Sequence, residues 1–291
     1  MIKAHHIIED WMQIRHILSR PLPSFYDQRR MAGSLMQKSY KWDMDCGWDK
    51  AVLMANNEGW PEGAALVKNL SDKYINNLSH LEYIQQYVYD VEGLTFDVGL
   101  LMQGEPEHWI RREDTDEISK RNGKLYNVVI NIGASSSVPS DYIVRRGAAA
   151  AAVVSLIEYA GLSCRLTTTD FVVNRKGTCE SRVDLTLKRH GEPLDIDRLA
   201  LAAVHPVGLR RIFFRVNELL NTDAMRKGMP YYVSSQAYGV PADLPDLSGI
   251  DVYSPTMRAI KKTVLDCPFS CDIKTEGWIK QQLVKLGVVG V

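Results

Sequence analysis

The stretch from residue 125 to residue 174 constrains the fold of this chain more than any other segment. Residues 125–132 (Leu-Tyr-Asn-Val-Val-Ile-Asn-Ile) form an almost unbroken apolar and β-branched run, which is typical of a strand buried on both faces. The spacing of apolar residues then predicts a helix from about Pro139 to Tyr159, followed by Gly161 at the position where helices commonly end. Residues 162–173 resume a strand pattern. A strand, a helix and a second strand in this order predict a parallel pair with a right-handed crossover.

The helix of this unit is small and apolar on every side over its centre, from Gly147 to Val154. Small side chains let neighbouring elements approach closely, so we expect this helix to be packed on more than one side. Ser137 or Ser140 can cap its first turn, in which Asp141 also lies.

The residues that follow extend the α/β pattern. The alternation of Val183, Leu185 and Leu187 predicts a strand over residues 181–188, which pairs with the preceding strand through the turn at residues 175–178. Helices are expected over residues 195–203, 206–220 and 275–286. We therefore predict an α/β domain over residues 111–291, in which helices flank a central, mainly parallel sheet.

Residues 1–110 carry mostly helical patterns. Apolar side chains recur at helical spacing over residues 1–20, and again in two short helices around the turn Gly59–Gly63. Residues 83–90 are rich in β-prone side chains, and residues 111–124 are expected to form a solvated loop or hairpin tip. We expect the N-terminal region to pack as a helical unit on the α/β domain.

The charge balance and the cysteines argue against several protein classes. Lys plus Arg and Asp plus Glu both number 35, so the formal net charge is +0, which disfavours a generally basic nucleic-acid binder. Five cysteines spread over the chain match neither a secreted disulfide framework nor a zinc site. No apolar run reaches the roughly 18–20 residues of a membrane span. We expect a soluble, intracellular protein without membrane association, metal or cofactor.

The segment that starts at residue 125 resembles the opening of a von Willebrand factor type A domain. That family has a buried strand ending in Asp-x-Ser-x-Ser, then a helix with small residues, then a second strand, and it binds a divalent metal through oxygen ligands. The matching positions are Asn131, Gly133 and Ser135, of which Ser135 alone keeps the ligand type. The resemblance implies a von Willebrand type A-like or Rossmann-like fold, whereas the missing carboxylate at position 131 implies that the metal site is lost.

Six short phrases, in order along the chain, resemble a family of conserved bacteriophage proteins known only as a domain of unknown function. They are Gly59–Gly63, Gly104–Glu107, Asn131–Ser135, Arg145–Ala149, Asp195–Ala200 and His205–Pro206. The resemblance implies a phage-encoded protein that acts in the host cytoplasm, and it implies no activity.

Ser135, Ser136 and Ser137 form the first candidate binding site. Their loop follows a predicted strand and precedes a helix, where open α/β sheets bind ligands and free N–H groups attract anions. The alternative is a helix cap with polar neighbours that binds nothing. The chain contains neither G-x-G-x-x-G nor G-x-x-x-x-G-K-[ST], so no motif supports nucleotide binding.

Five arginines form the second candidate binding site. They are Arg145, Arg146, Arg210, Arg211 and Arg215. Arg211 and Arg215 are four residues apart on one predicted helix face, which suits phosphate binding. Pairing with Glu218, Asp141 or Asp197 is the alternative. One exposed stripe of these arginines would favour a nucleic-acid partner.

Acidic residues and a histidine raise a catalytic hypothesis. Asp195 and Asp197, with Asp170, could hold a metal for hydrolysis if they converged on the Ser135 loop. Asp195 precedes an apolar-periodic helix, however, where an N-cap is the simpler role. His205 could act as a general base, but no nucleophile motif such as G-x-S-x-G accompanies it.

These patterns favour a non-enzymatic interaction or scaffold protein without catalytic residues. We expect it to bind a phage or host protein through the strand ends or the N-terminal helical region. A nucleic-acid-binding protein of phage replication or transcription is the alternative hypothesis, and a metal-dependent hydrolase is the least favoured.

Overall fold

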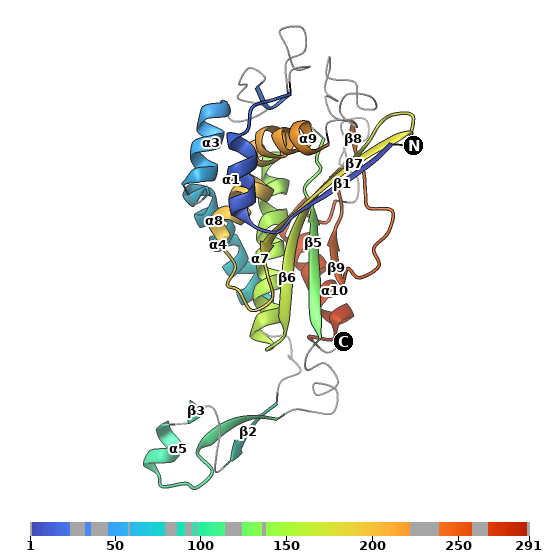
Figure 1. The fold of residues 1–291 in the computed structure, drawn as a ribbon. Coiled ribbons are helices and arrows are strands. Elements are labelled where there is room, and N and C mark those ends of the chain that lie inside the picture. The colour runs from blue at the N-terminus through green and yellow to red at the C-terminus, as the bar shows by residue number, and fades with distance from the viewer. Residues whose placement is uncertain are drawn as a thin grey trace.

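The computed structural model describes residues 2–23, 33–35, 46–57, 59–78, 86–90, 95–96, 98–113, 124–135, 138–221, 239–257 and 267–289. Within these residues, the centre of the molecule is a six-stranded sheet with the order β1-β7-β6-β5-β9, to which β8 adds by pairing with β6 (Figure 1). The strands are β1 (Ile2–Ile8), β5 (Leu125–Asn131), β6 (Ser163–Val173), β7 (Cys179–Lys188), β8 (Val240–Pro241) and β9 (Val252–Ser254).

The predicted strand–helix–strand unit is confirmed. β5 and β6 pair in parallel, from Leu125 opposite Ser163 to Asn131 opposite Thr169, and α7 (Ser140–Tyr159) connects them. β9 pairs in parallel with the other side of β5, whereas β7 is antiparallel to β6, as the short turn between them predicts. Val128 to Ile130 of β5 are all buried, so both faces of the strand are covered there, which accounts for its apolar run. The prediction of an α/β fold around a mostly parallel sheet is confirmed.

Helix α7 is deeply buried over its centre. All of its residues from Arg146 to Val154 are buried. It contacts α4 (Pro61–Leu78), α10 (Asp272–Leu286) and the strands β5 and β6, which confirms packing on more than one side. Its small side chains permit this close approach. The chain then turns at Gly161, whose φ of 72° is the left-handed conformation predicted for the helix end.

The N-terminal helix prediction is wrong for its first half. Residues 2–8 form the edge strand β1, parallel to β7, and helix α1 (Trp11–Ser19) begins only after Asp10. The Asp10 carboxylate accepts a hydrogen bond from the Gln13 N–H at 2.9 Å, so it caps α1 and fixes where the helix starts. In β1, exposed Lys3, His5 and Ile7 alternate with more buried neighbours, which is the period of a strand.

Residues 86–113 contribute a separate antiparallel sheet. It has the order β2-β4-β3, made of β2 (Gln86–Asp90), β3 (Thr95–Phe96) and β4 (Trp109–Glu113), with the short helix α5 (Val98–Met102) beside it. Figure 1 shows this sheet apart from the six-stranded sheet. β2 confirms the β-prone segment. The loop predicted over residues 111–124 is wrong at its start, where β4 continues to Glu113, and residues 114–123 lie outside the described part of the chain.

The helices predicted between residues 46 and 78 are confirmed as α3 (Trp48–Asn56) and α4. Those predicted over residues 195–220 are confirmed in position but contain two π-helical turns. α8 (Ile196–Leu199) continues into η2 (Ala200–Val204), and η3 (Gly208–Phe213) continues into α9 (Phe214–Leu220). Gly208 permits the sharp junction between the two pairs, because a Cβ there would lie 2.3 Å from the Leu201 carbonyl oxygen.

The C-terminal helix α10 begins earlier than predicted. Cys271 is its N-cap residue and α10 starts at Asp272, whereas the Thr275 hydroxyl donates back to the Cys271 carbonyl at 2.8 Å inside the first turn. Gly287, with φ of 67°, ends the helix. Among the helices described, none combines the length and the hydropathy needed to span a bilayer.

Candidate functional site

The turn that starts α4 is built directly against the start of α8. Gly59 has φ of 112°, and a Cβ at this position would lie 2.4 Å from the Asp197 carbonyl oxygen, so glycine is required. The Trp60 N–H donates to the same carbonyl oxygen at 3.1 Å. The Trp60 ring covers Gly63, where a Cβ would come within 1.9 Å of the ring. The phrase Gly59–Gly63 therefore fixes the position of α4 on α8.

His205 joins this junction from the end of η2. Its ring packs edge-on against Trp60, with 4.5 Å between the ring centroids and an interplanar angle of 83°. His205 Nδ1 accepts a hydrogen bond from the Val207 N–H at 3.0 Å. The side chain is thus buried and held at one ring nitrogen, which supports a structural role over that of a general base.

Arg146 ties the same junction to the end of β5. Its guanidinium donates to the carbonyl oxygens of Asn131 at 2.9 Å, Ile132 at 3.3 Å and Ala203 at 3.2 Å. Burial lowers the pKa of Arg146 to about 10, which still leaves the group charged at neutral pH. Five of the six phrases that resemble the phage family therefore belong to one connected region: Gly59–Gly63, Asn131–Ser135, Arg145–Ala149, Asp195–Ala200 and His205–Pro206.

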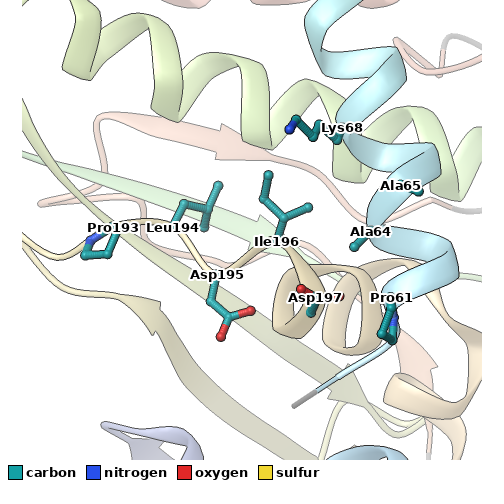
Figure 2. A pocket seen from close by; sticks show the side chains of 9 residues that line it. All are labelled: Pro61, Ala64, Ala65, Lys68, Pro193, Leu194, Asp195, Ile196 and Asp197. Atoms are coloured by element: carbon teal, nitrogen blue, oxygen red, sulfur yellow. The ribbon is translucent and has the colours of Figure 1, made fainter.

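This region carries an open cleft of about 590 Å³, which we name the α4–α8 cleft (Figure 2). One face of α4 and the segment that leads into α8 form its walls. The lining residues are Pro61, Ala64, Ala65, Lys68, Pro193, Leu194, Asp195, Ile196 and Asp197. Figure 2 shows Leu194 and Ile196 on the side toward Lys68, whereas the Asp195 carboxylate points the other way. Volumes of roughly 300–1,000 Å³ are typical of ligand sites, so this cleft is large enough to hold a bound group.

A comparison with protein families decides what the chain is related to. The model of a family described as "Domain of unknown function (DUF7192)" matches residues 3–288. The chain belongs to the DUF7192 family. This confirms the resemblance to an uncharacterised family. No curated protein and no solved structure matches the DUF7192 chain significantly.

The carboxylates of the hydrolase hypothesis have structural roles in this DUF7192 protein. Asp195 caps α8, as predicted: its carboxylate accepts the Arg198 N–H at 2.9 Å and pairs with Arg198 Nε at 3.0 Å. Asp170 lies on β6, where Oδ2 accepts a hydrogen bond from Asn217 Nδ2 of α9 at 3.0 Å. Within the described ranges, no group of three or more His, Cys, Asp or Glu side chains could hold a metal ion.

The described part of the serine loop uses its polar groups internally. The Ser135 N–H donates to the Met257 carbonyl oxygen at 2.9 Å, and the Ser135 carbonyl accepts the Val138 N–H at 3.0 Å. This arrangement supports the structural alternative for Ser135, because its N–H is not available to an anion. Ser136 and Ser137 lie outside the described residues.

Asn131, at the position of the first von Willebrand-type ligand, is a buried hydrogen-bond donor. Its amide nitrogen donates to the Ala242 carbonyl at 2.7 Å and to the Tyr253 hydroxyl at 3.0 Å, and its oxygen accepts the Gly133 N–H at 3.0 Å. A carboxylate could not donate these bonds. Asparagine is therefore the residue type that this strand end requires.

The five candidate arginines do not form one exposed stripe. Arg146, Arg211 and Arg215 are buried: Arg211 Nη1 donates to the Ser34 carbonyl at 3.0 Å, and the Arg215 guanidinium lies 4.1 Å from the Trp48 ring centroid. Arg145 pairs with Asp141 at 2.7 Å and with Asp272 at 3.0 Å, and Arg210 is half-buried. Arginine carries long apolar stems and a weakly hydrated guanidinium, which suits it to these internal contacts.

The sequence did not single out the α4–α8 cleft. Lys68, Ala64 and Leu194 carry no motif, and their meeting depends on packing between segments about 130 residues apart in the chain. Two features of the sequence indicate the site weakly. Gly59 and Gly63 lie on either side of Trp60, and Pro193 lies two residues before the predicted cap at Asp195.

Proposed function

We propose that this DUF7192 protein is a non-enzymatic interaction protein that binds a segment of a protein partner in the α4–α8 cleft. The observation that carries the proposal is the lining of the cleft. Six of its nine described residues are apolar or small: Pro61, Ala64, Ala65, Pro193, Leu194 and Ile196. Apolar area that a partner covers is removed from water, which is the main driving force of association.

A protein partner suits the cleft better than a small molecule does. Pro61, Ala65, Lys68 and Pro193 are all exposed, so the walls are low. Sites for small ligands bury about 70–90% of the ligand surface, and low walls cannot do this. A segment that belongs to a larger partner brings its own body to cover the rim and exclude water.

The chemistry of the lining also supports a binding role. The polar side chains among the described lining residues are one amine, Lys68, and two carboxylates, Asp195 and Asp197. Asp195 is engaged by Arg198, and the buried His205 ring packs edge-on against Trp60 and accepts the Val207 N–H. A binding surface needs no more than this set, whereas a catalytic site needs a positioned nucleophile or base.

The resemblances support further parts of the proposal. The protein is phage-encoded, acts in the host cytoplasm and binds a phage or host protein. Its core is von Willebrand type A-like, for which the succession β5, α7 and β6, with a small-residue helix, is the support. The burial of three of the five candidate arginines leaves the nucleic-acid alternative without its expected surface.

Filling the cleft tests this function. Ala65→Trp places a large ring in the cleft at an exposed helix position, where the fold can accept it. Leu66→Trp is the matched control, because Leu66 is 54% exposed on the same helix but does not line the cleft. Tagged protein and both variants are purified from infected cells, and the partner is then produced separately and titrated against each by calorimetry.

We expect wild type and Leu66→Trp to bind the purified partner with equal affinity, and Ala65→Trp to bind at least about tenfold more weakly, since loss of one good contact costs ~1.4 kcal/mol. Equal affinity of all three proteins for every copurified partner would refute the role of the cleft. Circular dichroism confirms that each variant is folded.

A further inference from the structure

We infer that the segment bound in the α4–α8 cleft is apolar and acidic, and that Lys68 binds its carboxylate. The inference rests on the proposed function and adds the chemical class of the bound segment and one residue that selects it.

Lys68 is placed to contact whatever occupies the cleft. It follows Ala64 and Ala65 by one turn on the same face of α4, as the 3.6-residue repeat requires. Figure 2 shows the side chains of Leu194 and Ile196, on the opposite wall, pointing toward the side on which Lys68 lies. Lys68 is exposed, and no ion pair or hydrogen bond of its side chain is found within the described residues. Lys73, on the same helix, is instead paired with Asp272 at 2.5 Å.

The Asp195 carboxylate on the opposite wall already has a partner. Asp195 accepts the Arg198 N–H and pairs with Arg198 Nε, and its carboxylate points away from Lys68 in Figure 2. Asp197 lies in the first turn of α8, where the N-terminal end of the helix favours negative charge, and it takes part in another interaction within the molecule. Of the three charged lining residues, Lys68 is therefore the one for which no interaction is found within the described residues, and we infer that its ammonium group contacts the ligand.

The apolar part of the ligand follows from the small side chains beside Lys68. Ala64 and Ala65 leave room on α4, and Leu194 and Ile196 face that room from the other wall. An apolar side chain placed there contacts both walls, and an Asp or Glu next to it in the peptide reaches Lys68. When the partner covers the rim and water leaves, the attraction between the two charges strengthens, because the local dielectric falls.

Selection from a peptide library tests the inference without a known partner. A library of random short peptides displayed on phage is selected on the full-length protein, and peptides that also bind Ala65→Trp are removed. The remaining, cleft-dependent peptides are sequenced. The selection is repeated on Lys68→Glu, which reverses the charge at the exposed position. Lys50→Glu is the matched control, because Lys50 is exposed on α3 and does not line the cleft.

We expect cleft-dependent peptides to combine Leu, Ile, Val or Phe with a neighbouring Asp or Glu. Lys68→Glu should replace the acidic residue by Lys or Arg, whereas Lys50→Glu should leave the selected sequences unchanged. A synthetic acidic peptide from the selection should bind about tenfold more weakly to Lys68→Gln than to wild type, and the difference should shrink as salt rises.

The peptide selection separates the role of Lys68 from the role of the cleft. Cleft-dependent peptides without acidic enrichment, or with basic enrichment on the wild type, would overturn the role of Lys68 and leave the proposed function in place. If no selected peptide depends on the cleft, both the inference and the proposed function are overturned.

Discussion

Among single residues, Asn131 occupies the position at which the von Willebrand factor type A family has its first metal ligand. Its side chain instead makes structural hydrogen bonds. It is fully buried, and its amide nitrogen donates two hydrogen bonds that a carboxylate cannot make. We expect Asn131→Asp to lower the free energy of unfolding by about 2–4 kcal/mol, because it buries a charge facing two oxygen atoms and breaks both bonds. Urea denaturation measures this.

Asn69→Asp is the control for Asn131→Asp. Asn69 is exposed on α4, so the same change of charge there should alter stability by less than about 0.5 kcal/mol. A stable Asn131→Asp protein whose melting temperature rises with magnesium would mean that the carboxylate rebuilds a metal site, and the structural role of the amide would be refuted.

Asp170 is a second residue whose burial has a measurable consequence. Burial raises its pKa to about 7, and the hydrogen bond from Asn217 opposes only part of this shift. Its ordinary pKa is 3.8, so the folded protein holds this proton more tightly than the unfolded chain does. The contribution of Asp170 to stability is therefore greatest below pH 4 and is lost as the pH rises toward 7.

Asp170→Asn removes this titration while keeping a similar shape. We expect the free energy of unfolding of the variant, minus that of wild type, to rise by roughly 2–5 kcal/mol between pH 4 and pH 8. Taking this difference removes the contributions of the other titrating groups, because they are the same in both proteins. A difference that is flat with pH would show that Asp170 is ionised in the folded protein with an ordinary pKa.

At the scale of elements, the sequence predicted best where one pattern holds over a whole element. The run in β5, the small-residue helix α7 and the alternation in β7 each have a single period, and each was placed correctly. Residues 1–20 instead contain a strand followed directly by a helix, so two periods meet within one short segment. Ile7 and Ile8 end β1 but also fit the helical spacing of α1, and the partner of β1 lies far along the chain, at β7. Local periodicity cannot resolve such a boundary.

Gly147 in α7 tests how closely the helices pack. It faces other helical segments: a Cβ would lie 2.3 Å from Val204 Cγ2 in η2 and 3.8 Å from Val67 Cγ2 in α4. Gly147→Leu should destabilise the protein by about 1–3 kcal/mol through overpacking. Gly277→Leu, in α10, has open space around its Cβ and should be neutral or stabilising by up to about 1 kcal/mol. Thermal melts that shift equally would refute the close packing at Gly147.

For the molecule as a whole, the candidate site could not be predicted from the sequence, and the reason is physical. The α4–α8 cleft joins residues 61–68 to residues 193–197, and the contacts that hold these segments together are backbone and ring contacts such as Trp60 N–H to the Asp197 carbonyl. Nearly any residue type can make a backbone contact, so such contacts cannot be predicted from the residue types. The glycine at position 59 is the exception, because its backbone conformation and its closeness to Asp197 leave no room for a side chain.

The separate sheet β2-β4-β3 gives the last prediction. Its strands pair with one another, and the pairings described for β2, β3 and β4 all lie within this sheet. On α5, Val98 and Met102 are 62% and 81% exposed, so these apolar side chains are not used by the main body. Replacing residues 80–123 by a flexible Gly/Ser linker of about 15 residues, which spans roughly 20 Å, should therefore leave the six-stranded sheet folded.

We expect the shortened protein to melt within a few degrees of the full chain, because no described core contact of the main body is removed. It should also keep the affinity for a cleft-dependent peptide, since α4 and α8 are intact. A longer linker is the control for strain between Leu78 and Lys124. If both shortened proteins lose the thermal transition, residues 80–123 are part of the cooperative core, and the separation of the two sheets in Figure 1 does not describe independent stability.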